Sequence, residues 1–156
     1  MCLTMIYIYI MSKVLEIGIS NNSGRKIESY NSIKAIKGRG LVNDRHFKED
    51  NDKRCQITLI AIENIIYYNK KFSTTISPLK FRRNIVTQNI NLNNLLKEEF
   101  FIGSVKVKAH DLCRPCKHLQ ELLGQKNIIK EFLLKGGLRC EILSDGIINI
   151  NDKIRI

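Results

Sequence analysis

Short apolar runs separated by turn-forming residues dominate the hydrophobic pattern of this chain. β-Branched and aliphatic residues with partial alternation of apolar and polar positions predict strands. This pattern occurs in seven segments, residues 14–19, 55–60, 84–87, 104–109, 138–143, 147–150 and 153–156. The Asp145-Gly146 pair in "SDGI" is typical of a hairpin turn and predicts that the segments on either side of it pair.

Helical periodicity is confined to three segments, residues 61–71, 115–123 and 125–135. Pro115 suits the first turn of the second helix, because the N–H that proline lacks has no partner there. The third segment stops at Gly136-Gly137, residues typical of a helix C-terminus. Several short strands with a few helices predict a mostly β fold, a closed or nearly closed β-barrel with helical insertions, in one domain.

The first ten residues, "MCLTMIYIYI", are apolar but lack a basic leader. A helix needs about 20 apolar residues to span a bilayer, so this run predicts no membrane anchor. Met11 opens "MSKVLEIGIS", an ordinary polar-then-strand beginning. We therefore expect residues 1–10 to be an upstream extension or disordered, and residues 11–156 to form the domain.

The formal net charge of +11 is typical of proteins that bind nucleic acid, anionic membranes or acidic ligands. No helix-turn-helix, RNA-recognition or zinc-finger pattern accompanies this charge, and the lysines are scattered along the chain. We therefore expect neither nucleic acid nor membrane as a partner. Five cysteines, an odd number without a cleavable secretory signal, predict reduced thiols and a cytoplasmic protein.

The segment "HDLCRPCKHL", residues 110–119, places Cys113 and Cys116 on either side of an Arg-Pro pair. A zinc site would need a second ligand pair that the sequence does not supply, and a thioredoxin-like dithiol would need a βαβ context that is missing. Both cysteines can also be small buried residues of the core. Because Cys116 lies at a predicted helix start among basic residues, its thiolate form is favoured there, and a thiolate binds metals or attacks electrophiles.

Two further segments have the composition of anion-binding loops. Glycines in "KGRGLVNDRHF", residues 37–47, let an anion approach backbone N–H groups, and they precede Asp44, Arg45 and His46. In "FRRNI", residues 81–85, paired arginines supply the bidentate forks that suit phosphate. Either segment alone is equally consistent with a turn and a solvated basic face.

Taken in order, five blocks resemble the MOSC domain, a family named from the C-terminal domain of molybdenum-cofactor sulfurases. The blocks are "GRGLVNDRHF", "QITLIAIENI", "FRRNIVTQNINLNNLL" followed by "EFFIGSVKV", "LCRPCKHL" and "GGLRCEILSDGIININD". The resemblance covers roughly residues 14–156, and five blocks in the right order are far more specific than any one of them. It implies a β-barrel of the MOSC type, in agreement with the strand pattern.

The resemblance also implies site residues. In molybdenum-binding relatives the metal ligand is similar in position to Cys116, which would be both the metal ligand and the catalytic cysteine. Basic and backbone groups of the two loops hold the phosphate of the molybdenum cofactor (molybdopterin) in those relatives. The residues in this chain that correspond to them are Arg82, Arg83 and Asn84, with Asp44, Arg45 and His46 as neighbours.

Three functions are consistent with these residues. The first is a stand-alone cofactor-binding protein that takes a small-molecule substrate and reduces N-hydroxylated compounds, with a reductase as electron donor. The second is a sulfur carrier that receives a persulfide on Cys116 from a cysteine desulfurase, without a cofactor. The third is a non-catalytic basic binding module.

Overall fold

The computed structural model describes residues 11–22 and 26–156, so the expectation for residues 1–10 lies outside the described residues. Its strands are β1 (Lys13–Ile19), β2 (Glu28–Tyr30), β3 (Ser32–Ile36), β4 (Gly40–Leu41), β5 (Ile57–Ala61), β6 (Ile85–Gln88), β7 (Glu99–Ile102), β8 (Val105–Leu112), β9 (Leu138–Ile142), β10 (Gly146–Asn149) and β11 (Ile154–Arg155). The α-helices are α1 (Ile62–Phe72), α2 (Lys117–Leu123) and α3 (Ile128–Glu131), and the short 3₁₀ helices are η1 (Pro78–Phe81) and η2 (Leu92–Leu95).

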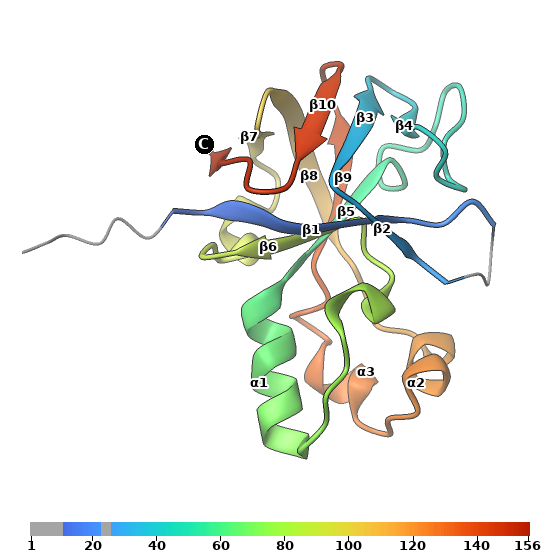
Figure 1. Ribbon diagram of the computed structural model, residues 1–156, viewed down its shortest axis with the longest axis vertical. Coiled ribbons are helices and arrows are strands. Elements are labelled where there is room, and N and C mark those ends of the chain that lie inside the picture. Colours follow the sequence, from blue (N-terminus) through green and yellow to red (C-terminus); the bar gives the residue numbers. More distant parts are fainter. Residues whose placement is uncertain (1–10, 23–25) are drawn as a thin grey trace, which may run out of the picture.

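Eight strands form one curled sheet in the order β11-β7-β8-β9-β5-β6-β1-β2. Backbone hydrogen bonds join the start of β1 to the segment before β11: Val14 donates to Asp152 O over 2.9 Å, and Ile154 donates to Ser12 O over 2.9 Å. These bonds bring β11, at one end of the sheet, against the start of β1, the strand next to the other end, and the prediction of a mostly β fold with a closed or nearly closed barrel is confirmed. A second sheet, β10-β3-β4, lies beside the barrel (Figure 1).

Within the eight-stranded sheet, β5 and β6 are parallel, whereas their other neighbours are antiparallel. A parallel pair needs a crossover connection, and α1 with η1 supplies it. The three α-helices lie together at one end of the molecule (Figure 1). None of the helices in the described ranges is long and apolar enough to cross a membrane.

Apolar side chains form two cores. The larger fills the barrel interior, with Val14, Ile57 and Phe100 among its buried members. The smaller lies between the helices and the outer face of the barrel, where the Phe132 ring packs 5.5 Å from Tyr68 and 4.9 Å from Phe81, centroid to centroid. The helices are therefore fixed to the barrel by a separate aromatic cluster.

All seven predicted strand segments overlap a strand, but four strands were not predicted. β2 ("ESY") and β4 ("GL") are too short or too polar to give a pattern. β3 ("SIKAI") does alternate, with Ile33 and Ala35 buried, so its signal was available in the sequence. β7 ("EFFI") completes the barrel beside β11.

The predicted hairpin at Asp145-Gly146 is wrong. β9 pairs with β5 and β8 in the barrel, whereas β10 pairs with β3 in the second sheet. The Asp145 carboxylate accepts a hydrogen bond from the Lys37 N–H over 2.7 Å, which directs the turn toward the loop after β3. The Asp145-Gly146 turn therefore has the sequence of a hairpin turn, but it carries the chain from the barrel into the second sheet.

The predicted helix over residues 125–135 is also wrong in extent, because α3 covers only Ile128–Glu131. Gly136 and Gly137 lie beyond it and serve a different purpose. A Cβ on Gly137, whose φ is +100°, would collide with the Leu59 carbonyl oxygen, and one on Gly136 would collide with the Cys113 carbonyl oxygen. These glycines allow the backbone before β9 to pass against β5 and the end of β8.

Substitution of Gly137 tests this close approach. Gly137→Ala should lower the free energy of unfolding by about 3 kcal/mol or more, because the added methyl group meets backbone that cannot move aside. Gly124→Ala is the matched control, since Gly124 also has positive φ (+62°) but has no neighbour within 4 Å of the added atom. It should cost only about 1–2 kcal/mol, the intrinsic cost of the left-handed conformation. Urea unfolding of both variants measures the difference, and equal losses would contradict the close approach.

Candidate functional site

A pocket of about 310 Å³ lies where the barrel meets the helical end of the molecule. Its walls come from the loop after β4, the start of β5, the turn from η1 into β6, the connection from β8 to α2, and β9. All seven site residues predicted from the sequence line it: Asp44, Arg45, His46, Arg82, Arg83, Asn84 and Cys116. The fold thus brings together three segments that lie far apart along the chain.

Arginine is concentrated in this pocket, which we call the arginine pocket. Six of the eight arginines in the described part of the chain line it: Arg45, Arg54, Arg82, Arg83, Arg114 and Arg139. None of the 17 lysines, all of them in the described part of the chain, does so, and Asp44 is the one carboxylate in the lining. Guanidinium groups form bidentate hydrogen bonds to phosphate and other oxyanions, so this composition favours an anionic ligand.

Arg82 holds an unusual backbone conformation in the pocket wall. It ends η1 in the left-handed region, with φ 63° and ψ 31°, a conformation that is uncommon for residues other than glycine. Burial lowers the pKa of its guanidinium, and the nearby positive charge of Arg45 lowers it further. The fold therefore holds two like charges close together, and a bound anion would relieve this repulsion.

Asp44 fixes the loop that carries Arg45 and His46. It is buried, and its carboxylate accepts backbone hydrogen bonds from Ser20 over 3.2 Å and from His46 over 3.3 Å. The Arg45 N–H donates in turn to Ser20 O over 2.8 Å. Asp44 thus ties this loop to the end of β1 and positions two basic side chains at the pocket.

His46 accepts a hydrogen bond from Arg45, whose Nε lies 3.0 Å from the Nε2 atom of the imidazole. An imidazole nitrogen accepts a hydrogen bond only when it carries no proton, so this contact requires the neutral ring. Burial is the main cause that lowers the pKa of His46, and the charge of Arg45 is the second. The histidine adds a neutral polar group to an otherwise cationic wall.

Asn84 joins three strands of the barrel at the pocket floor. Its Oδ1 accepts hydrogen bonds from the Thr58 N–H over 3.0 Å and the Thr58 hydroxyl over 3.1 Å, and its Nδ2 donates to Gly18 O over 3.1 Å. Gly18 N–H donates to Asn84 O over 2.8 Å. The side chain that the sequence suggested for cofactor binding is thus engaged in holding β1, β5 and β6 together.

Arg83 is held by backbone carbonyl groups, one of them in the segment between α3 and β9. Its Nε donates to Gly136 O over 3.0 Å, and its Nη1 donates to Phe81 O over 3.1 Å. Arg83 also contacts the Cys113 thiol. Two backbone contacts therefore fix the guanidinium before any ligand binds.

The two cysteines of "CRPC" have different environments. Cys113 is only 3% exposed, and burial raises the pKa of its thiol. Cys116 is exposed at the pocket and is the residue that caps α2, where its Sγ accepts a hydrogen bond from the Leu119 N–H over 3.4 Å. Pro115 was expected in the first turn of this helix, but it precedes the capping residue, because the helix begins at Lys117. Cys116 is the more accessible sulfur.

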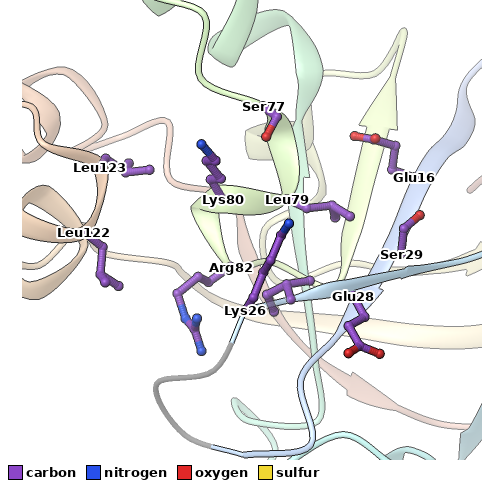
Figure 2. Close-up of a pocket in the computed structure, with 11 residues that line it drawn as sticks. Glu16, Lys26, Glu28, Ser29, Ser77, Leu79, Lys80, Arg82, Leu122 and Leu123 are labelled. Atoms are coloured by element: carbon purple, nitrogen blue, oxygen red, sulfur yellow. The ribbon is translucent and has the colours of Figure 1, made fainter.

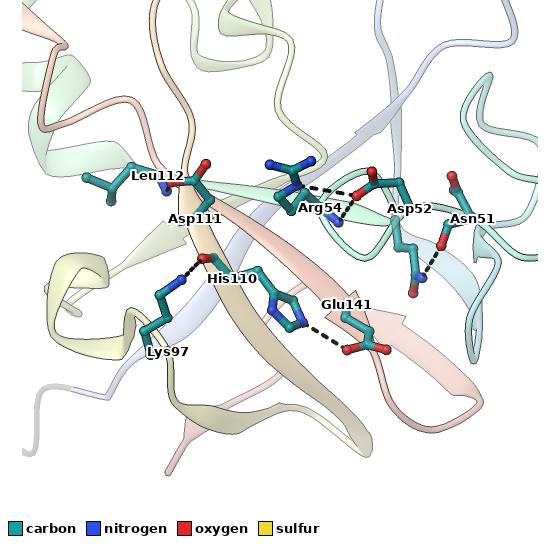
Figure 3. Close-up of polar contacts among 9 residues, drawn as sticks. Asn51, Asp52, Arg54, Lys97, His110, Asp111, Leu112 and Glu141 are labelled. Carbon is teal, nitrogen blue, oxygen red and sulfur yellow. Dashed lines mark hydrogen bonds and ion pairs between the residues drawn. The ribbon is translucent and has the colours of Figure 1, made fainter.

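Sequence reasoning missed Arg54, Arg139 and Cys55, which also line the pocket. Arg54 belongs to a turn in which its N–H donates to Asp52 Oδ1 over 2.8 Å (Figure 3). No local sequence pattern marked these residues, because the gathering of arginines without lysines is visible only in the folded protein. His110, which flanks the "CRPC" segment, pairs with Glu141 over 2.8 Å and does not line the pocket (Figure 3).

Removal of the Asn84 side chain tests whether its hydrogen bonds stabilise the junction of β1, β5 and β6. Asn84→Ala leaves half-buried groups of Thr58 and the buried Gly18 carbonyl without their partners and should lower the free energy of unfolding by about 2–4 kcal/mol. Asn94→Ala, at an exposed position, is the control and should change stability by less than about 0.5 kcal/mol. Urea unfolding of both variants is the measurement, and a stable Asn84→Ala protein would leave the side chain available for a ligand.

Solved structures similar to this chain share its fold at low sequence identity. The YuaD protein of Bacillus subtilis has a TM-score of 0.80 at 17% identity, over 93% of this chain and 94% of that one. YiiM of Geobacillus stearothermophilus has a TM-score of 0.72 at 14% identity, over 92% and 74% of the two chains. YiiM of Escherichia coli has a TM-score of 0.66 at 15% identity, over 92% and 67%.

The family comparison agrees with the blocks read from the sequence. No curated protein matches the chain in sequence. The model of the MOSC domain matches residues 43–155, a range that begins just before Asp44 and contains every predicted site residue. Because this match spans most of the chain, the protein belongs to the MOSC domain family.

Proposed function

We propose that the arginine pocket binds the molybdenum cofactor, with Cys116 as the metal ligand, and that the protein reduces N-hydroxylated compounds. The observation that carries this proposal is the convergence of six arginines and one exposed cysteine on a single pocket. The arginines suit the phosphate of the pterin, and the thiolate suits the metal. Membership of the MOSC family supports the same assignment.

The residues present fit the cofactor in their chemistry. Thiolate sulfur is a soft ligand, and Cys116 offers it at the surface of the pocket. The carboxylate of Asp44 accepts hydrogen bonds from two backbone N–H groups, which occupy it within the loop. Because Asp44 is the one carboxylate in the described lining, against six arginines, the wall keeps a net positive charge toward a ligand.

When bound, the molybdenum cofactor supplies two-electron oxygen-atom transfer. The overall reaction is R–NH–OH + 2 e⁻ + 2 H⁺ → R–NH₂ + H₂O, in which the N–O bond breaks and the nitrogen is reduced. A reductase is the proposed source of the electrons. The protein's own contribution is to hold the phosphate with Arg82 and Arg83 and to position the reacting end of the substrate near Cys116.

Exchange of single arginines tests cofactor capture. Arg82→Ala should reduce the molybdenum and pterin content of protein made in a cofactor-competent host, since one charged hydrogen bond contributes about 1.5–3 kcal/mol. The same loss is expected for Arg83→Ala, which also removes backbone contacts, so its melting temperature must be measured as well. Arg155→Ala removes an equal charge outside the pocket and should keep its cofactor. Full metal content in both pocket variants would exclude these residues from the site.

Serine substitutions at the two cysteines test the metal ligand. Cys116→Ser should abolish bound molybdenum and the reduction of an amidoxime by a reduced viologen dye, with little change in melting temperature, because the thiol is exposed. Cys113→Ser should retain a substantial part of the metal. Equal losses would contradict a single ligand and favour a dithiol. Metal-free protein with a labelled persulfide on Cys116 would contradict the proposal in favour of a sulfur carrier.

A further inference from the structure

A second and larger cavity, of about 780 Å³, adjoins the arginine pocket, and we call it the Glu16 chamber. Ile27, Arg82 and Leu122 line both spaces, so the two cavities meet at these side chains. The volume lies within the range of small-molecule sites, about 300–1,000 Å³. The Glu16 chamber is thus large enough to hold the part of a substrate that does not react.

The walls of the chamber differ in character from one side to the other. Figure 2 shows Glu16 and Glu28, from β1 and β2, on one side and Leu122 and Leu123, from α2, on the other. Arg82 is on the side of Leu122, close to the arginine pocket (Figure 2). The chamber therefore has a basic, apolar end near the arginine pocket and an acidic end away from it.

Part of the chamber's apolar lining depends on Gly18 of β1. A Cβ on Gly18 would collide with the side chain of Ile27 and would lie 2.8 Å from Leu79 Cδ2. The absence of this atom lets both apolar side chains pack over β1. They line the chamber with a surface that suits the apolar body of a ligand.

Glu16 has a carboxylate oxygen without a hydrogen-bond donor. Its Oε2 is buried, and no group in residues 11–22 and 26–156 donates to it. Burial also raises the pKa of this carboxyl group. By contrast, Glu28 is exposed and accepts a hydrogen bond from the Tyr30 hydroxyl over 3.4 Å. A ligand group that donates a hydrogen bond or carries positive charge would supply the missing partner of Glu16. Such a contact would stabilise the complex more at Glu16 than at the exposed Glu28.

None of the three basic residues that line the chamber offsets the charge of Glu16 through an ion pair in the described part of the chain. Lys26 and Lys80 are exposed, so water screens their charges, and Arg82 lies at the junction with the arginine pocket. Neither lysine forms an ion pair with Glu16 in the described part of the chain. These cations leave the carboxylate of Glu16 available to a ligand.

We propose that the Glu16 chamber selects substrates that carry a protonated amine or N–H donor group opposite the N–O bond. The N–O end points past Leu122 into the arginine pocket toward Cys116, the apolar body lies between Leu79 and Leu122, and the donor group binds Glu16. The identity of the reacting end rests on the function proposed above. The recognition of the donor end rests on the chamber alone.

Three matched benzamidoximes test the selection: one with a para-aminomethyl group, one with a para-methyl group and one with a para-carboxylate. Isothermal titration of the full-length, cofactor-loaded protein should give a dissociation constant about tenfold lower for the aminomethyl probe than for the methyl probe. The carboxylate probe should bind most weakly. In Glu16→Gln the preference for the amine should fall below about twofold. Glu28→Gln, which neutralises the exposed carboxylate of the same chamber, should keep the preference.

The probe ranking in the unchanged protein tests the inference even if Glu16→Gln is poorly folded. Equal affinity for the three probes, or a preference that survives Glu16→Gln, would overturn the inference. Titration of the aminomethyl and methyl probes into cofactor-free protein separates it from the proposed function, since the carboxylate probe would bind the open arginine pocket there. If the protein never binds molybdenum but still prefers the amine, recognition by the Glu16 chamber is supported and the proposed reaction is refuted. If all three probes are reduced at equal kcat/KM, the proposed reaction is supported, and substrate selection by the Glu16 chamber is contradicted.

Discussion

The concentration of guanidinium groups in one pocket is the constraint on which the rest of the site depends. Two unit charges about 4 Å apart repel by about 4 kcal/mol where the effective dielectric constant is near 20, so a group of arginines must be held in place by other contacts. Backbone carbonyls hold Arg83, and the left-handed turn at the end of η1 fixes Arg82. Asp44 offsets part of this repulsion at Arg82, and a bound anion would relieve more of it, so the pocket would favour anionic ligands before any metal chemistry takes place.

The barrel supplies the rigid frame for this arrangement. Asn84 joins β1, β5 and β6, Asp44 fastens the loop that carries Arg45, and Gly136 with Gly137 allows the start of β9 to pass under Cys113. Asp44 and Asn84 also line the pocket, but their polar groups are engaged with the backbone or with neighbouring strands. The arginines and Cys116 are the lining groups that we propose contact a ligand.

The sequence predicted the barrel strands well because buried strands carry their own signal in alternating apolar residues, as β8 and β9 do. It did not predict the separation of β9 from β10, because an Asp-Gly turn has the same local signature whether or not the flanking strands pair with each other. The candidate site residues were found through family-like blocks. Arg54 and Arg139 were missed because each stands alone in sequence, and only the fold brings them beside Arg82. The role of Asn84 in holding β1, β5 and β6 together depends on strand neighbours that no local pattern specifies.

The central claim, that the arginine pocket and Cys116 hold one cofactor, is tested most directly by its position. Crystals of protein from a cofactor-competent host should show an anomalous-difference peak at the molybdenum absorption edge. We expect a single peak beside the Cys116 sulfur, inside the pocket lined by the six arginines. A molybdenum peak elsewhere on the molecule, or no peak in the pocket, would contradict it.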